Sequence, residues 1–206
     1  MIIGIVNFKM GNINSVCNAL DFLGCENKII NTQEDFENIT HLILPGVGSF
    51  KDAMINLNKL NFVSKIKEKV LEEKKKILGI CLGMQLLGSS STENGDTTGL
   101  SLIENKVDKF SKEDVKQNNI PHVGFNNIDI IDDKSGFFNN LTNKSNFYFV
   151  HSYRMKPNNL KNDFALCKYG TDFLAAFKFK NIYGVQFHPE KSQSCGIQIL
   201  TNFLKN

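Results

Sequence analysis

Several features that would place a protein in a special class are missing from this chain of 206 residues. No apolar run approaches the roughly 18 residues that a membrane-spanning helix needs. The opening apolar segment, residues 2–6, is too short for a signal peptide and has no cationic lead. The net charge is only +3, and basic residues form no stripe with aromatic ones. We therefore expect a cytoplasmic protein with neither a membrane nor a nucleic-acid partner.

Paired cysteines and linkers are missing as well. The cysteines, at positions 17, 25, 81, 167 and 195, are irregularly spaced and include no CxxC pair of the kind that holds zinc or carries out redox chemistry. Free thiols in a reducing compartment are the simplest interpretation. Since no Pro- or Gly-rich linker and no internal repeat interrupts the chain, we expect a single domain over residues 1–206.

Enough apolar residues are present for a sizeable core, because hydrophobic residues make up 41% of the chain. Apolar segments typical of strands occur at 2–6, 27–30, 42–44 and 77–80, with helical patterns between and after them at about 13–23, 50–57, 62–73 and 83–88. This alternation predicts an α/β fold with a parallel sheet covered on both faces. Further extended segments are predicted at 127–131, 147–150, 164–168, 174–179 and 182–187, followed by a helix at about 194–204.

The most informative segment is Gly79-Ile80-Cys81-Leu82-Gly83, which has the form of a nucleophile elbow with Cys in place of Ser. The glycines allow a tight strand-to-helix turn without a Cβ clash. The N-terminus of the following helix favours a thiolate, and the amide of Leu82 is placed to stabilise an oxyanion. We predict that Cys81 is a nucleophile; the alternative is a buried structural cysteine.

A base and its orienting carboxylate follow the last predicted strand, at His188 and Glu190. Residues two apart in extended backbone face the same side, and Pro189 favours extended geometry at His188. Glu190 can then accept a hydrogen bond from one ring nitrogen and leave the other free to face a thiol. The alternative is a chance pair of surface side chains.

A glycine loop, Pro45-Gly46-Val47-Gly48, ends the strand at 42–44. Such a loop can turn a backbone amide toward a developing oxyanion, although a simple turn would look the same. Phosphate binding is less favoured, because the Lys-Ser/Thr of a P-loop is absent.

Three motifs together carry a family resemblance: PGVG at 45–48, GICLGMQLL at 79–87 and GVQFHPEKS at 184–192. Further matches are MGN at 10–12, PHVG at 121–124 and FVHSY at 149–153. The chain resembles the class I glutamine amidotransferases from its first strand to its last helix, and within them the glutaminase subunits of imidazole glycerol phosphate synthase. The resemblance implies a three-layer αβα fold with a mostly parallel central sheet.

The resemblance also implies roles for particular residues. Cys81 would be the nucleophile, His188 the base and Glu190 its orienter. The amides of Gly48 and Leu82 would form the oxyanion hole, after a peptide flip in the PGVG loop. The substrate glutamine would be held by Gln85 and Glu93, with Tyr148, His151 and Ser152 beside the pocket. His151 could equally be a hydrogen-bonded core histidine, and we expect His41 and His122 to be structural.

The implied partner is a (β/α)8 barrel synthase that receives ammonia in a heterodimer and forms imidazole glycerol phosphate and aminoimidazole carboxamide ribotide in histidine biosynthesis. Neither a metal nor an organic cofactor is implied. The motif residues that would face the barrel are Pro121, Phe125, Asn126 and Lys191, with Lys191 near the path of ammonia.

Two departures from the family pattern keep alternatives open. Phe125 stands where a tryptophan is usual, and the opening Asn7-Phe8-Lys9-Met10 differs from the usual Asp-Tyr-Gly-Met. A paralogous glutaminase that supplies ammonia for amination of a nucleotide-linked sugar in surface polysaccharide biosynthesis is therefore an alternative. A cysteine peptidase on the same scaffold, and a non-catalytic regulatory module, are more distant ones.

Overall fold

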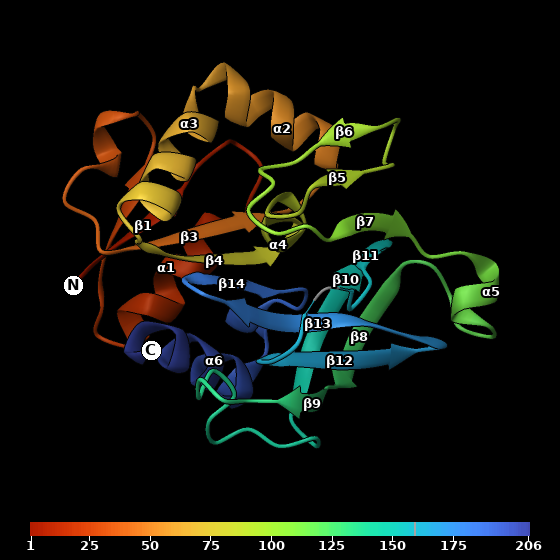
Figure 1. Ribbon diagram of the computed structural model, residues 1–206. Coiled ribbons are helices and arrows are strands. Elements are labelled where there is room, and N and C mark those ends of the chain that lie inside the picture. Colours follow the sequence, from red (N-terminus) through yellow and green to blue (C-terminus); the bar gives the residue numbers. More distant parts are fainter. Residues whose placement is uncertain (159) are drawn as a thin grey trace.

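The computed structural model describes residues 1–158 and 160–206 and is built around a large central sheet (Figure 1). In this described part the sheet has eight strands in the order β2-β1-β3-β4-β14-β13-β12-β9. Their bounds are β1 (Ile2–Val6), β2 (Glu26–Ile30), β3 (His41–Gly46), β4 (Lys76–Cys81), β9 (Asp129–Asp132), β12 (Phe164–Tyr169), β13 (Thr171–Phe179) and β14 (Ile182–Val185). Pairing is parallel from β2 to β14 and antiparallel from β14 to β9. The predicted mostly parallel sheet is confirmed.

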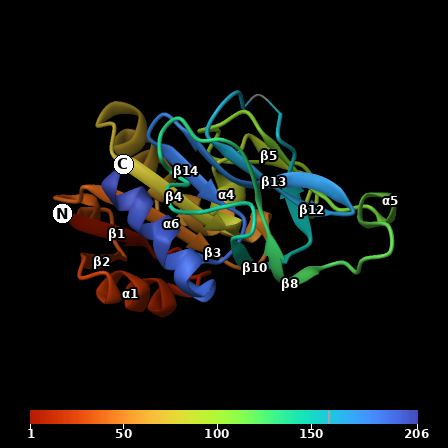
Figure 2. The same cartoon turned by 90° about the horizontal axis from the view of Figure 1, so that it is seen from below.

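Helices cover both faces of this sheet (Figures 1 and 2). On one face lie α1 (Ile13–Phe22) and α6 (Gln193–Lys205), and on the other α2 (Phe50–Lys59) and α3 (Phe62–Lys67). Strand β3 shows the cause, because successive strand residues point to opposite faces. Ile43 packs in the α1–α6 cluster, whereas Leu42 and Leu44 pack in the α2–α3 cluster. The three-layer αβα fold is therefore confirmed.

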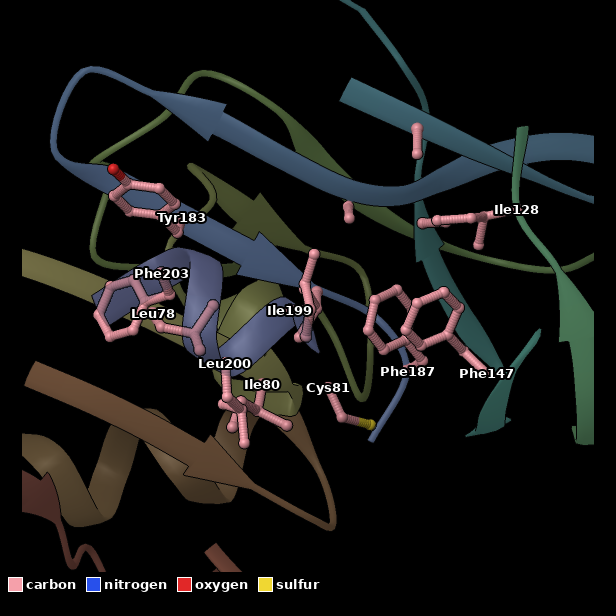
Figure 3. Packing of buried hydrophobic residues seen from close by; sticks show 14 of the residues in the cluster. Leu78, Ile80, Cys81, Ile128, Phe147, Tyr183, Phe187, Ile199, Leu200 and Phe203 are labelled. Carbon is pink, nitrogen blue, oxygen red and sulfur yellow. The ribbon is translucent and has the colours of Figure 1, made fainter. Parts of the chain in front are cut away.

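The core on the α6 side reaches the end of β4. Figure 3 shows Leu78 and Ile80 of β4 in one apolar cluster with Leu200 and Phe203 of α6, and Cys81 at its margin. The nucleophile predicted from the sequence is therefore attached to a buried strand at the edge of this apolar cluster. Among the described residues, no helix combines the length and the apolarity needed to cross a bilayer.

Several predicted elements have different bounds; for example, the strand expected at 174–179 begins at Thr171. The helix expected at 62–73 is α3 followed by a π-helical turn, η2 (Glu68–Glu72), in which Glu73 N donates to Glu68 O at 3.1 Å. The segment expected as one strand at 127–131 belongs to two strands, β8 (His122–Asn127) and β9. At the buried Ile128 between them, the chain leaves a two-stranded sheet and enters the central sheet. The last strand ends at Val185 rather than at 187, after which the chain crosses toward β10 (Asn146–His151).

Several short elements were not predicted. A second sheet contains β5 (Ser90–Ser91), β6 (Thr97–Thr98), β7 (Lys106–Lys109) and β11 (Tyr153–Met155), and β8 pairs with β10 in a two-stranded sheet. The other short pieces are η1 (Glu34–Phe36), α5 (Lys112–Val115) and η3 (Pro189–Lys191). Strands of two to four residues are too short to show an alternating pattern, which explains why they were missed.

The parallel pairing brings three loops to one edge of the central sheet. Gly46 at the end of β3 is paired with Cys81 at the end of β4, and Val185 at the end of β14 is paired with Ile80. The glycine loop, the cysteine turn and the segment that carries His188 and Glu190 therefore leave the sheet together.

The turn after β4 depends on a close backbone crossing. A Cβ on Gly83 would lie 1.6 Å from the carbonyl oxygen of Leu44, and one on Gly79 would lie 2.7 Å from backbone atoms of Gly83. These glycines let α4 (Leu82–Leu86) pack directly on β3 and β4, as the pentapeptide indicated.

We expect Gly83→Ala to lower the free energy of unfolding by about 3 kcal/mol or more, because α4 would have to move off β3. Urea denaturation followed by circular dichroism measures this. Gly11→Ala is the control: its Cβ would have no neighbour closer than 3.5 Å, so its stability should stay close to that of the parent. A Gly83→Ala protein as stable as the control would show that the crossing is looser than described.

Candidate active site

Cys81 occupies a strained turn at the junction of β4 and α4. Its backbone angles are φ 53° and ψ −110°, in a region that non-glycine residues rarely adopt. Such strain persists only where the surrounding structure imposes it, and it is common at catalytic centres. The Cys81 side chain is 6% exposed and lies at the start of α4.

His188 and Glu190 form a buried pair beside this turn. His188 Nδ1 lies 2.8 Å from Glu190 Oε1, and both side chains are almost completely buried. Within the described residues, His188 Nε2 has no hydrogen-bond partner of normal geometry. The carboxylate therefore fixes one side of the imidazole and leaves the other side available to the Cys81 thiol.

The charge state of His188 follows from these neighbours. Burial lowers its pKa, but interactions with Cys81 and with the Glu190 carboxylate more than compensate and raise the pKa to about 10. His188 is therefore held as an imidazolium at neutral pH. A positive imidazolium beside a sulfur atom is the arrangement that favours a thiolate nucleophile.

A pocket of about 350 Å³ opens at the sulfur. Most residues predicted for the site line it: Gly48, Cys81, Leu82, Gln85, Glu93, Pro121, His151, Ser152 and His188. Val47, Val150 and Tyr153 complete the lining and were not assigned to the site from the sequence. The pocket lies at the carboxyl ends of parallel strands, the usual ligand site of open α/β sheets.

Gly48 and Leu82 face this pocket from two sides of Cys81. Gly48 has φ +105°, a conformation that favours glycine. The preceding residue, Val47, donates a hydrogen bond from its backbone N to Met10 O at 3.1 Å. Leu82 is the first residue of α4, where backbone N–H groups have no acceptor within the helix. Both residues therefore line the same pocket as the Cys81 sulfur.

Gln85 and Glu93 line the pocket and also have partners in the protein. Gln85 Nε2 donates to Tyr153 O and to Gln186 Oε1, each at 3.0 Å. Glu93 Oε2 accepts from Phe50 N at 2.7 Å, at the N-terminus of α2. These contacts fix the orientation of both side chains before any ligand binds.

His151 is both a pocket residue and a hydrogen-bonded core histidine. Its Nδ1 lies 2.8 Å from Tyr153 O, and its Nε2 lies 3.2 Å from His122 Nδ1. Burial lowers the pKa of His151 to about 3 and that of His122 to about 4. Both rings are therefore neutral at pH 7. The ring of His122 is also stacked at 3.9 Å, centroid to centroid, on that of Tyr169.

Tyr148, Phe125, Asn126 and Lys191 lie outside the pocket. The rings of Tyr148 and Phe125 are 5.5 Å apart, and Lys191 Nζ lies 5.8 Å from the centroid of Tyr148. Asn126 Nδ2 donates to Lys168 O at 3.3 Å. Val123, Phe125 and Tyr148 lie on one face of the antiparallel pair of β8 and β10, which we call the β8–β10 hairpin although β9 lies between them in the chain, and Lys191 of η3 lies beside Tyr148. Phe125 is 49% exposed on this face.

The backbone of Tyr148 connects this surface to His188. Tyr148 O accepts from His188 N at 2.9 Å, and Tyr148 N donates to Ser192 Oγ at 2.9 Å. The position of the imidazole is therefore tied to β10.

One functional candidate was missed by the motif analysis. Gln186 lies within the GVQFHPEKS motif, which predicts no role for it. Its side chain is fully buried, and its Nε2 lies 3.6 Å from Cys81 Sγ. A signal was present in the sequence, because Gln186 is a polar residue between two apolar ones, Val185 and Phe187, beside the predicted base.

Comparison with known proteins agrees with this geometry. The family model described as "Glutamine amidotransferase class-I" matches residues 4–206. The fold is shared with a solved structure described as a glutamine amidotransferase, with a TM-score of 0.73, 17% identity and coverage of 98% of this chain and 97% of that one. PurLQS from Thermotoga maritima matches with a TM-score of 0.77 and 17% identity over 99% of this chain and 97% of that one. The chain belongs to the class I glutamine amidotransferase family.

Two relatives within this family carry the same kind of name. "Imidazole glycerol phosphate synthase subunit HisH 1" of Campylobacter jejuni (strain RM1221) is 44% identical, over 98% of this chain and 99% of the relative. "Imidazole glycerol phosphate synthase subunit HisH 2" of Methanococcus maripaludis is 42% identical, over 98% of both chains. The resemblance inferred from the motifs is confirmed.

The histidines provide a direct test of the site's electrostatics. We expect His188 to remain an imidazolium from pH 6 to above pH 8, while His41, His122 and His151, whose pKa values burial lowers to about 4, 4 and 3, remain neutral above pH 5.5. Nitrogen-15 NMR of the imidazole rings across a pH titration distinguishes the two forms.

A Cys81→Ala variant serves as the comparison. It removes one of the two groups that raise the pKa of His188, so its imidazolium should lose the proton at lower pH. Titration of His188 near pH 6.5 in the parent protein would contradict the ion-pair arrangement.

Proposed function

We propose that this chain is the glutaminase subunit of an imidazole glycerol phosphate synthase, acting as one domain over residues 1–206. The observation that carries the proposal is the meeting of Cys81 with the His188–Glu190 pair at the mouth of a pocket of about 350 Å³. The relatives named for that synthase support the choice of reaction. They do not favour the alternative, amination of a nucleotide-linked sugar.

In the proposed reaction, the Cys81 thiolate attacks the side-chain amide carbon of glutamine, and the carbonyl π electrons move to the oxygen. When the tetrahedral intermediate collapses, the C–N bond breaks and the proton on His188 Nε2 passes to the leaving nitrogen. The products of this half-reaction are ammonia and a γ-glutamyl thioester. His188 then removes a proton from water, and the oxygen attacks the thioester carbon. The C–S bond breaks, glutamate leaves, and the Cys81 thiolate and the His188 imidazolium are restored.

Glu190 keeps the imidazole in place through both proton transfers and stabilises its charged form. The amides of Gly48 and Leu82 are the proposed oxyanion donors, and each such donor contributes about 3–4 kcal/mol to lowering the barrier. The positive φ of Gly48 supports a loop that can present its amide in more than one orientation.

Gln85 and Glu93 are the proposed contacts for the polar ends of glutamine, with His151 and Ser152 completing the wall. The Glu93 carboxylate suits the α-ammonium group, because it lines the pocket and Phe50 N holds one of its oxygens, Oε2, in place. Tyr148 contributes through its backbone rather than its ring, because the ring lies on the hairpin surface.

We further propose that the β8–β10 hairpin surface, with Pro121, Phe125, Asn126 and Lys191, binds a (β/α)8 barrel synthase in a heterodimer. Pro121 supports this placement, since it lies on the hairpin and also lines the pocket. Ammonia would pass into the barrel without meeting solvent, where it would be protonated. A cytoplasmic location fits this role and the free state of the cysteines.

The catalytic assignment is tested by Cys81→Ala together with a histidine-pathway barrel subunit and its phosphorylated ribulose substrate. We expect glutamine-dependent synthesis to fall at least about 1,000-fold, because no nucleophile remains. Synthesis from added ammonium salt should be unchanged. Cys25→Ala, which changes a half-buried cysteine between α1 and β2, should retain both activities. Residual glutamine-dependent synthesis at the parent rate would disprove the role of Cys81.

The partner surface is tested with a matched pair of exposed phenylalanines. Phe125→Asp should weaken binding of the barrel subunit at least about tenfold, because a charge would be buried in the interface. Phe179→Asp changes a residue that is 40% exposed on β13, outside the hairpin, and should bind like the parent. Titration calorimetry gives both affinities, and glutaminase rates with and without the barrel show whether turnover depends on docking. Equal affinities for the two variants would place the interface elsewhere.

A further inference from the structure

A line of hydrogen bonds inside the protein leads from the β8–β10 hairpin to the nucleophile. It begins with His122 and His151, continues through Tyr153 O and Gln85, and ends where Gln186 Nε2 meets Cys81 Sγ at 3.6 Å. We propose that Gln186 is a positioning residue, whose amide N–H holds the sulfur of Cys81 in its reactive, ionised form. Its importance for glutamine hydrolysis rests on the proposed function; its effect on the sulfur does not.

The direction of donation along this line is fixed by one backbone group. Tyr153 O can only accept, so Gln85 must direct its NH2 group toward it. The second hydrogen of that NH2 group then points to Gln186, which must present its carbonyl oxygen, Oε1. The NH2 group of Gln186 is consequently turned toward Cys81 Sγ. The assignment of these two amides follows from the network and leaves no alternative orientation that keeps all the contacts.

An N–H donor at this point distinguishes between the two forms of the sulfur. A thiolate accepts hydrogen bonds, whereas a thiol has a proton to donate, and the acceptor available for it is Val150 O at a distant 3.9 Å. A hydrogen bond to a charged group is stronger than one between neutral groups, particularly away from water. Gln186 therefore favours the thiolate from the side opposite the solvent, independently of His188.

The location of Gln186 separates this role from substrate binding. Its side chain is fully buried, and it is not among the residues that line the pocket. A ligand in the pocket would meet Gln85, and Gln186 lies behind it. Loss of Gln186 should therefore change the reactivity of Cys81 more than the affinity for glutamine.

The test measures the rate at which iodoacetamide alkylates Cys81, followed by peptide mass spectrometry. At pH 7 we expect Gln186→Met, which fills the same space without a donor, to slow alkylation of Cys81 at least about tenfold. Gln186→Glu keeps an acceptor for Gln85 but turns an oxygen toward the sulfur, so it should slow alkylation further. The half-buried Cys195 in the same protein provides an internal standard for the reagent.

The pH profile separates an effect on ionisation from damage to the fold. The difference in alkylation rate between Gln186→Met and the parent should become smaller as the pH is raised, since added base supplies the thiolate that the missing donor no longer favours. The titratable side chains around the sulfur are His188 and Glu190 after β14, His151 on β10, Tyr153 on β11 and Glu93 in the pocket wall, and all are unchanged in both variants.

Asn202→Leu is the matched control for loss of a buried amide. Asn202 Nδ2 donates to Phe137 O at 3.0 Å and to Asn139 O at 2.8 Å, on α6 and away from the pocket. This variant should lose stability and alkylate Cys81 at the parent rate. If both Gln186 variants also alkylate at the parent rate per folded molecule, Gln186 is merely structural and the proposal is wrong. Because the readout requires neither glutamine nor a barrel subunit, it stands even if the proposed function fails.

Discussion

The site depends on one close contact, the crossing of α4 over the end of β3. Because Gly83 lies against the carbonyl of Leu44, the chain has room for only a sharp turn after β4. That turn forces Cys81 into a backbone conformation that residues other than glycine normally avoid. The parallel register then brings the glycine loop and the His188 segment to the same edge. The strained backbone of Cys81 is thus held by buried strands on either side of it.

Electrostatics within the site divide buried histidines into two classes. His122 and His151 are neutral, because burial opposes charge and their partners are each other and a backbone carbonyl. His188 is buried as deeply but faces a carboxylate and a sulfur, and these reverse the effect of burial on its pKa. Equal burial therefore produces opposite charge states, and what decides is whether a negative group lies within hydrogen-bonding distance.

The sequence was sufficient for the features that depend on local pattern. Alternating apolar segments predicted the parallel sheet and its helices, and the glycines around Cys81 predicted the turn. Short strands such as β5 and β6 were beyond reach, because two residues show no periodicity and are held by partners distant in the chain. Among the site residues, too, the sequence revealed those that share a local motif and not those that packing brings together. His188 and Glu190 are neighbours in sequence, but the ring of Tyr148 and the amide of Gln186 are directed by packing that no motif records.

Tyr148 belongs to two environments at once. Its ring lies on the outer face of the hairpin beside Phe125 and Lys191, whereas its carbonyl oxygen holds the amide of His188. One residue therefore contributes a side chain to the exposed surface and a backbone acceptor to the segment that carries the catalytic imidazole.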